Sequence, residues 1–292
     1  MAQNVFSTPY NLNEEPGLRK KLEQEGFKFS KINYAFWQAK KDKISVTLYN
    51  SGKLLIQGWG AGEFAQEMIS TGEKIDKLEH IADLESWIGT DESGKGDFFG
   101  PLVTAAVFVN KSNLKKLILL GVQDSKAMSD KKIFEVAQKI QENFDNAVEI
   151  IKPEHYNRLY KQFKNLNKLL ALSHAQVIEN ILKKVDCNVV LSDKFGDESL
   201  ISNALLKKGR QVTLVQQTKA ESNAAVAAAS IIARAEFLNQ LTKLSRKFQI
   251  VFPKGASSNV IQTGKLFVEQ HGITQLNKAA KLHFKTAKKI SN

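Results

Sequence analysis

The segment from Trp87 to Val109 constrains the fold of this chain more than any other part of the sequence. A short apolar run ends in two adjacent acids, Asp91 and Glu92, and a Gly-Lys-Gly turn follows at 94–96. A second apolar run, rich in β-branched residues, then favours another strand. The pattern predicts strand, turn and strand, with two acids beside backbone amides that the glycines expose. Carboxylates bind hard metal ions and exposed amides bind phosphate or sugar oxygens, so the segment indicates metal-dependent chemistry on a nucleic-acid backbone.

The composition favours a polyanionic partner. The 292-residue chain has 42 Lys and Arg against 30 Asp and Glu, a formal charge of +12. Its length admits two domains. The lone Cys187 excludes an internal disulfide framework and a cysteine-based metal cluster. No stretch approaches the roughly 20 apolar residues of a membrane helix and no signal-peptide pattern is present, so we expect a soluble, cytoplasmic protein, with a monomer as the default.

Residues 1–72 predict a small α+β domain. A charged helical pattern covers 16–26, and a second short helix is predicted at 62–69. Between them lie four predicted strands, at 27–29, 34–39, 44–49 and 54–59. Residues 73–86 are charged and weakly periodic, which suits a linker.

From residue 87 onward, strands alternate with helices, which is typical of an α/β domain. After the opening hairpin, strands are predicted at 147–151, 188–191 and 211–216. Helices are predicted at 131–143, 166–184 and 222–244, with a short one beyond Gly196 and helical material to residue 292. We therefore expect a mixed sheet of about five strands, flanked by helices, over residues 87–292.

Two further acids could join the pair on the first strand. Asp193 follows the strand at 188–191, at the position where α/β sheets bind ligands. Glu221 opens the alanine-rich helix, where an acid stabilises the helix dipole without any other role. The small side chains at 224–230, however, allow that helix to lie close to the sheet and bring Glu221 towards the strand ends.

Asp91 and Glu92 would point to opposite faces of a regular strand. They share one site only if the strand ends or bulges there, which Gly94 and Gly96 permit. With the two distant acids they could hold a pair of Mg²⁺ or Mn²⁺ ions, which activate a water molecule and stabilise the leaving oxygen of a phosphodiester.

Other kinds of site find little support. The Gly94-Lys95 pair lacks the preceding glycine and following Ser or Thr of a phosphate-binding loop, and Gly94-x-Gly96 lacks the third glycine of a dinucleotide fingerprint. None of the five histidines forms a metal-ligand pair at helical spacing. We expect His174, within a helix, to be packed or capped rather than catalytic, while His283 lies among lysines.

At these residues the chain resembles the type-2 ribonucleases H, and in particular the bacterial ribonuclease HIII family. The resemblance covers nearly the whole length and rests on motifs in the family's order: Asp91-Glu92-Ser93-Gly94-Lys95-Gly96-Asp97, Asp124-Ser125-Lys126, Ala227–Arg234, Pro253–Ser257 and Leu282–Thr286. It implies a ribonuclease H-like fold preceded by a TATA-binding-protein-like domain that binds substrate. It also implies an endonuclease that hydrolyses the RNA strand of RNA–DNA hybrids with Mg²⁺ or Mn²⁺, leaving 5′-phosphate and 3′-hydroxyl ends.

The resemblance assigns roles position by position. It implies that the catalytic metal ligands are Asp91, Glu92, Asp193 and Glu221. The loop of Ser93, Gly94, Lys95 and Gly96 would read the 2′-hydroxyl groups that distinguish RNA from DNA. The other implied substrate contacts are Ser125 and Lys126, which would hold a phosphate of the DNA strand, and Lys254, His283 and Lys285.

Two alternatives remain open from the sequence. A ribonuclease HII-like enzyme nicks at single embedded ribonucleotides and commonly has a tyrosine soon after a Lys-Gly pair, where this chain has Ala256. A non-catalytic nucleic-acid-binding protein would use only the basic surface. That surface includes a C-terminal set of lysines predicted to contact phosphates: Lys278, Lys281, Lys285, Lys288 and Lys289.

Overall fold

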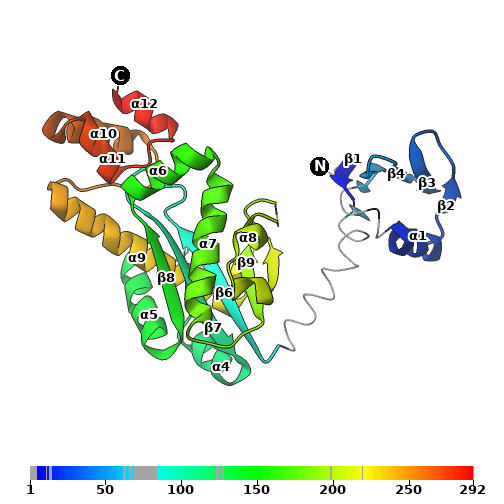
Figure 1. Ribbon diagram of the computed structural model, residues 1–292, viewed down its shortest axis with the longest axis horizontal. Coiled ribbons are helices and arrows are strands. Elements are labelled where there is room, and N and C mark those ends of the chain that lie inside the picture. The colour runs from blue at the N-terminus through cyan, green and yellow to red at the C-terminus, as the bar shows by residue number, and fades with distance from the viewer. Residues whose placement is uncertain are drawn as a thin grey trace. The chain divides into compact units, whose positions relative to one another are not determined.

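The chain folds into two compact units, Met1–Asp83 and Leu84–Asn292. The structure is a computed structural model, and it describes residues 5–10, 12, 15–61, 64–65, 68, 84–122, 125, 128–197, 199–218 and 220–291. The predicted helix at 62–69 and the predicted linker at 73–86 therefore lie largely outside the described residues. Figure 1 shows the elements of each unit.

The first unit is an antiparallel sheet whose described strands run in the order β1-β5-β4-β3-β2. Its elements are β1 (Val5–Pro9), α1 (Glu15–Gln24), β2 (Lys28–Ser30), β3 (Ala35–Lys41), β4 (Ile44–Tyr49) and β5 (Lys53–Gly58). The predicted helix and the four predicted strands are confirmed within two residues at each end. Strand β1 was not predicted.

One face of this sheet carries the core and the other faces outward. Along β3, Trp37 and Ala39 are buried whereas Phe36 and Lys40 are exposed, as the two-residue period of a strand requires. Helix α1 covers the buried face with Leu18 and Leu22. The outer face is therefore left to polar and aromatic side chains.

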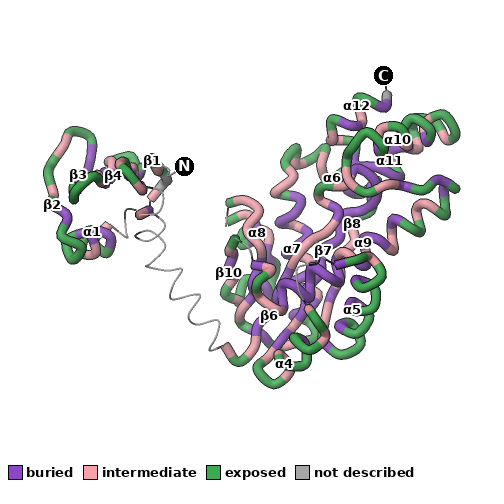
Figure 2. The backbone as a smooth tube through the Cα atoms, turned by 180° about the vertical axis from the view of Figure 1, so that it is seen from behind, coloured by how far each residue is buried: buried purple, intermediate pink, exposed green. Residues whose placement is uncertain are grey.

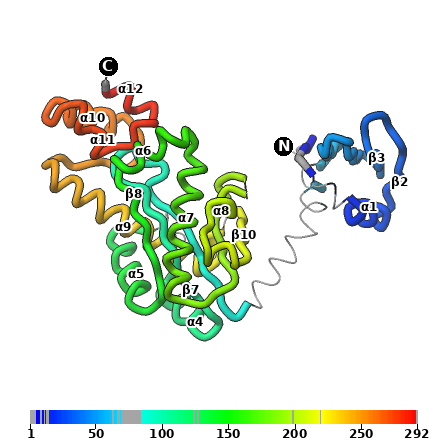
Figure 3. Tube along the Cα trace, in the orientation of Figure 1, coloured from blue at the N-terminus to red at the C-terminus, as the bar shows by residue number. Residues whose placement is uncertain are grey.

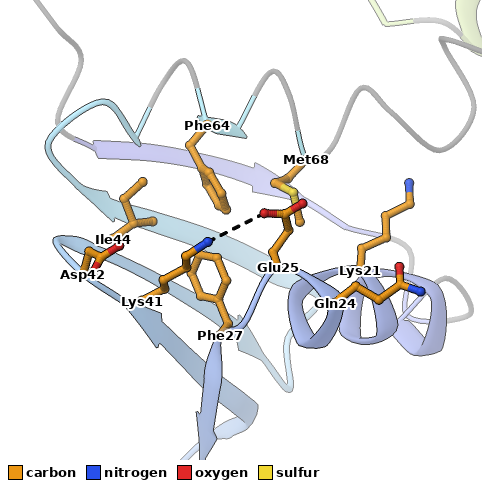
Figure 4. Close-up of a pocket in the computed structure, with 9 residues that line it drawn as sticks. All are labelled: Lys21, Gln24, Glu25, Phe27, Lys41, Asp42, Ile44, Phe64 and Met68. Atoms are coloured by element: carbon orange, nitrogen blue, oxygen red, sulfur yellow. Dashed lines mark ion pairs between the residues drawn. The ribbon is translucent and has the colours of Figure 1, made fainter.

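A cavity of about 480 Å³ opens beside α1 in this unit (Figure 4). The rings of Phe27 and Phe64 lie 5.3 Å apart in its wall. At its rim the ammonium of Lys41 lies 3.7 Å from the carboxylate of Glu25, so these two charges neutralise each other.

The second unit is built on a mixed sheet whose described strands run in the order β10-β9-β6-β7-β8. These strands are β6 (Ser86–Ser93), β7 (Leu102–Asn110), β8 (Asn146–Ile151), β9 (Val189–Asp193) and β10 (Thr213–Gln217). Strands β6, β9 and β10 are parallel, and β7 and β8 run antiparallel to their neighbours. The predicted mixed sheet of about five strands is confirmed.

Helices surround this sheet. They are α4 (Lys111–Leu119), α5 (Asp130–Asn143), α6 (Pro153–Phe163), α7 (Leu166–Leu182), α8 (Ser199–Ala204), α9 (Ala224–Phe248), α10 (Ser258–His271), α11 (Leu276–Ala279) and α12 (Lys285–Ser291), with 3₁₀ turns η3 (Gly209–Gln211), η4 (Ala220–Ser222) and η5 (Ile273–Gln275). Figure 3 shows α10, α11 and α12 grouped at one end of the unit. Helices α4 and α6 were not predicted, since their sequences are dominated by charged and polar residues.

Strand β6 is enclosed between α7 and α9, and its alternation assigns each residue to one of them. Ile88 packs in a cluster with α7 residues, whereas the indole of Trp87 donates to Asn223 at the start of α9. A Cβ added to Gly89 would lie 2.3 Å from the backbone of Ala225 in α9. The predicted close approach of the alanine-rich helix is thus confirmed, and the central strands are buried on both faces (Figure 2).

Two details differ from the sequence-based expectation. Strand β6 neither ends nor bulges before the acids, because its ladder with β7 is regular through Ser93. Glu221 lies in η4 rather than in the first turn of α9, because Asn223 caps that helix through its side chain. No helix among the described residues is both long and apolar enough to span a membrane.

Candidate active site

Asp91 lies near the end of β6 on the α9 face. Its carboxylate accepts a hydrogen bond from the backbone N–H of Glu92 at 2.8 Å and another from the hydroxyl of Ser230 in α9. Burial, together with the negative charge of Glu92, raises the pKa of Asp91 to about 7, although both hydrogen bonds act in the opposite direction. A bound cation would favour the ionised form, so the donor chemistry here fits a hard metal ion.

Glu92 points to the opposite face, towards α7. Its Oε2 lies 3.1 Å from Nε2 of His174, and its Oε1 lies 3.3 Å from the ammonium of Lys95. Burial raises the pKa of Glu92, but the hydrogen bond and charge of His174 and the charge of Lys95 together hold the pKa below its ordinary value. Glu92 is therefore ionised at neutral pH.

Asp193 ends β9, next to β6. The parallel register pairs Thr90 with Ser192, and Ser192, like Thr90, approaches His174 on the α7 side. Asp193 therefore faces the α9 side, as Asp91 does. Its Oδ1 accepts the N–H of Ala220 at 3.3 Å, which ties it to the 3₁₀ turn that carries Glu221.

The arrangement thus places two acids on one face of neighbouring strands, with Glu221 in the adjacent turn and Glu92 on the other face. Within the part of the chain that the structure describes, no three His, Cys, Asp or Glu side chains converge into a group that could hold a metal. The four-carboxylate metal site therefore stays a prediction.

His174 is a site residue that the sequence suggested to be packed or capped. It is fully buried in α7, and besides Glu92 it contacts the hydroxyl of Thr90 at 3.1 Å through Nδ1. Its tilted ring lies 5.2 Å from that of Phe195. The available sequence signal was a histidine among apolar helix residues, which does not reveal the strand acid that it meets.

The glycine loop after β6 has a fixed backbone. Gly94 has a φ of +86°, and an added Cβ would lie 2.2 Å from the carbonyl oxygen of Pro101. Gly96 is exposed, with nothing within 4 Å of an added Cβ. The loop therefore offers open backbone at Gly96 beside a rigid anchor at Gly94.

Lys281 clamps the residues that follow this loop. Its ammonium donates to the carbonyl oxygens of Asp97 at 2.8 Å and Gly100 at 2.7 Å, and its backbone N–H donates to Phe98. The side chain is fully buried, and burial lowers the pKa of Lys281 to about 7. The predicted phosphate contact at Lys281 is therefore wrong.

The other lysines of that set, Lys278, Lys285, Lys288 and Lys289, are exposed. His283 is stacked on Tyr160 at 4.2 Å between ring centroids, and its ring lies tilted against that of Phe284 at 4.5 Å. Burial, with the charge of Lys281, lowers the pKa of His283 to about 4, so the ring is neutral near pH 7 and cannot attract a phosphate as a cation.

The remaining predicted substrate residues fall in different settings. Ser125 is buried, and its hydroxyl lies 2.7 Å from that of Ser230, the residue that hydrogen-bonds Asp91. The Ser125 side chain therefore points inward rather than towards solvent. Lys126 lies outside the described residues. Lys254 is exposed and pairs with Asp130 at 2.9 Å, which also binds Arg234.

Comparisons with known proteins agree with this architecture. The family model described as Ribonuclease HII matches residues 88–287, and that described as Domain of unknown function (DUF3378) matches residues 14–77. The chain is 39% identical to "Ribonuclease HIII" of Chlamydia abortus over 96% of this chain and 97% of that protein. It is 41% identical to "Ribonuclease HIII" of Chlamydia pneumoniae, covering 98% and 97% of the two chains.

Solved structures give the same assignment. The crystal structure of Bst-RNase HIII in complex with Mn²⁺ matches with a TM-score of 0.69 and 30% identity, covering 98% of both chains. That of Aquifex aeolicus RNase H3 matches with a TM-score of 0.57 and 30% identity, covering 96% of this chain and 100% of that one. These likenesses confirm the predicted ribonuclease H-like domain preceded by a small TATA-binding-protein-like α+β domain. The chain belongs to the ribonuclease HIII family, and the predicted identity as an endonuclease of the ribonuclease H class is confirmed.

Proposed function

We propose that this enzyme hydrolyses the RNA strand of RNA–DNA hybrids at the strand-end site that contains Asp91, Glu92, Asp193 and Glu221, with two divalent ions, Mg²⁺ or Mn²⁺. The observation that carries this proposal is the pair of adjacent acids on β6, one of which has its pKa raised to about 7. The negative charge of Glu92 next to Asp91 makes the ionised form of Asp91 costly without a cation. The similar Bst-RNase HIII was crystallised in complex with Mn²⁺, which supports the choice of ion. When bound, such ions activate water and stabilise the leaving oxygen.

The residues of this chain then supply binding and orientation. Asp91 and Asp193, on one face of neighbouring strands, would hold the ions together with Glu92 and Glu221. The exposed backbone at Gly96, anchored through Gly94, is suited to a 2′-hydroxyl group because no side chain blocks it.

We also propose that residues 1–72 bind the hybrid through the outer face of their sheet. Lys28 and Lys40 are direct antiparallel partners, and both are exposed on that face beside Phe36, which is 48% exposed. Like charges directly opposite each other destabilise a sheet, so their presence suits an anionic partner. Residues 73–86 would join this domain to the catalytic domain at 87–292, and the enzyme would act as a cytoplasmic monomer.

The test compares cleavage of a uniformly ribonucleotide RNA–DNA hybrid with cleavage of a DNA duplex that contains one ribonucleotide, each in Mg²⁺ and in Mn²⁺. Gly255 donates its N–H to the carboxylate of Asp97, just after the glycine loop, at 2.6 Å. The next residue, Ala256, is exposed. This chain therefore has a methyl group where a ribonuclease HII-like enzyme commonly has a tyrosine ring. We expect efficient cutting of the hybrid and poor cutting of the single ribonucleotide. Efficient nicking of the second substrate would instead assign a ribonuclease HII-like activity.

An Asp91→Asn variant serves as the control for chemistry. It should bind the hybrid as the wild type does and lose cleavage, because only the metal-binding charge is removed. Failure of the wild type to cut the hybrid with either ion would overturn the proposed function.

A further inference from the structure

The imidazole of His174 connects three residues from the two parallel strands at the centre of the site. Its Nδ1 faces the hydroxyls of Thr90 on β6 at 3.1 Å and Ser192 on β9 at 3.5 Å. Its Nε2 faces Oε2 of Glu92 at 3.1 Å. Thr90 and Ser192 are register partners, so this ring lies where the two strands are still paired, one step before their acids.

These contacts determine the proton on the ring. A carboxylate oxygen only accepts hydrogen bonds, so Nε2 must carry a proton to bond Glu92. A hydroxyl both donates and accepts, so Thr90 can serve Nδ1 whether or not that nitrogen also carries a proton. The ring is fully buried and lies tilted against that of Phe195, and its helix is held to the sheet by the 2.6 Å contact of Ser173 with Thr104. His174 therefore has little freedom to turn away from Glu92.

We propose that His174 is a positioning residue for Glu92, holding Oε2 so that Oε1 is the oxygen turned towards the divalent ion. This inference rests on the proposed function. The Lys95 ammonium, 3.3 Å from Oε1 and partly exposed, shows that a positive group can approach that oxygen. Without His174 the Glu92 side chain would be free to rotate, and both oxygens would compete for Lys95 and the ion.

The experiment uses two substitutions that each preserve one half of the ring's contacts. His174→Gln places an amide donor near the position of Nε2, and His174→Asn places an amide near the position of Nδ1. Mn²⁺ binding to the full chain without nucleic acid is measured by electron paramagnetic resonance titration. We expect His174→Gln to remain close to wild type and His174→Asn to lose about 10–100-fold in Mn²⁺ affinity, the usual range for groups that orient a metal ligand.

Ser173→Ala is the matched control. It removes a buried hydrogen bond from the neighbouring residue of α7 without touching Glu92, so it should lower the melting temperature and leave Mn²⁺ affinity unchanged. Equal losses of affinity in His174→Gln and His174→Asn, or a similar loss in Ser173→Ala, would show that His174 only packs. Cleavage assays should add a raised Mn²⁺ requirement for His174→Asn, with an unchanged KM for the hybrid at saturating ion.

A measurement on the wild type keeps the inference testable if the variants do not fold. Nitrogen-15 NMR of the histidine ring should show the proton of His174 on Nε2, and a neutral ring protonated only on Nδ1 would overturn the inference. The two proposals fail separately. A wild type that cuts no hybrid rejects the proposed function, whereas a wild type that cuts and binds Mn²⁺ beside equally impaired variants rejects only the role of His174.

Discussion

The hydroxyl oxygens of Ser125 and Ser230 lie 2.7 Å apart, and Ser230 also hydrogen-bonds the carboxylate of Asp91. Ser125, which the family resemblance assigns to a substrate phosphate, is therefore joined to the predicted metal ligand Asp91 by two hydrogen bonds through Ser230. The same segment is held on its other side by Arg234, whose guanidinium donates to the carbonyl of Ser125.

Replacing Ser230 with alanine should weaken metal binding at Asp91. The hydrogen bond from Ser230 lowers the pKa of Asp91, so its loss raises that pKa further and moves the acidic limb of the pH–rate profile to higher pH. We expect a loss of about 10–100-fold in Mn²⁺ affinity or activity. The exposed Ser112→Ala is the control, and an unchanged pH profile in Ser230→Ala would contradict the prediction.

Gly89→Ala should destabilise the catalytic unit. The new Cβ would lie 2.3 Å from the backbone of Val226, so α9 must move away from β6. Overpacking of this kind costs about 1–3 kcal/mol or more, and urea denaturation measures the loss. Gly96→Ala is the matched comparison, because its added Cβ meets nothing within 4 Å and should leave stability unchanged. Any loss of hybrid cleavage in Gly96→Ala would then come from an effect on substrate binding rather than on folding.

Lys281 should make stability depend on pH in the alkaline range. The pKa of Lys281 is about 7 in the folded chain, below the ordinary lysine value of 10.5. Between these two values the unfolded chain binds the additional proton, so the free energy of unfolding rises with pH, by up to about 1.4 kcal/mol per unit. The measurement compares urea denaturation of the wild type and Lys281→Met across that window.

In Lys281→Met the free energy of unfolding should no longer rise with pH between about 7 and 10.5. The variant Lys278→Met, which changes an exposed lysine, should keep this rise. Parallel curves for the wild type and Lys281→Met would mean that Lys281 keeps an ordinary pKa.

Lys28 and Lys40 should contribute to hybrid affinity through counterion release. Replacing either with glutamine should reduce the salt dependence of binding by about one unit in log K against log salt, and weaken binding of all hybrid sequences alike. Thermal stability should rise slightly, because two like charges no longer face each other. Lys20→Gln, on the helix that covers the opposite face, is the control. Equal slopes of log K against log salt for all three variants would mean that the hybrid does not bind the sheet face that carries Lys28 and Lys40.

Much of the fold could be predicted because its strands carry clear patterns. The alternation of strands and helices after residue 87 specified a mixed sheet, and small residues at 224–230 predicted the close helix that Gly89 accommodates. Helix α6 was not predicted because Pro153 and the polar residues after it are typical of a loop. Only the tertiary structure shows that Tyr156 is buried on one side of this helix. Strand β1 is short, and it is a strand because it pairs with β5, a contact that the local sequence does not reveal.

For the site, the sequence identified the acids but not their surroundings. The regular ladder that sends Asp91 and Glu92 to opposite faces depends on pairing with β7, so the sequence alone could not show whether the strand ends or bulges at the acids. His174 and Ser230 become neighbours of these acids only because α7 and α9 lie on opposite faces of β6. Lys281 resembles a surface cation in the sequence because Lys278 and Lys285 lie nearby, and only its burial against Asp97 and Gly100 shows otherwise.

The clamp between Lys281 and Gly100 joins residues 181 positions apart, and this separation orders events during synthesis. The ribosome delivers every candidate carboxylate and the glycine loop well before it delivers Lys281, which holds the residues after that loop. Chains fold as they emerge, so a nascent chain ending near Glu221 carries the acids with an unclamped loop. The contacts of Lys281 with Asp97 and Gly100 therefore form only after nearly the whole chain has been synthesised.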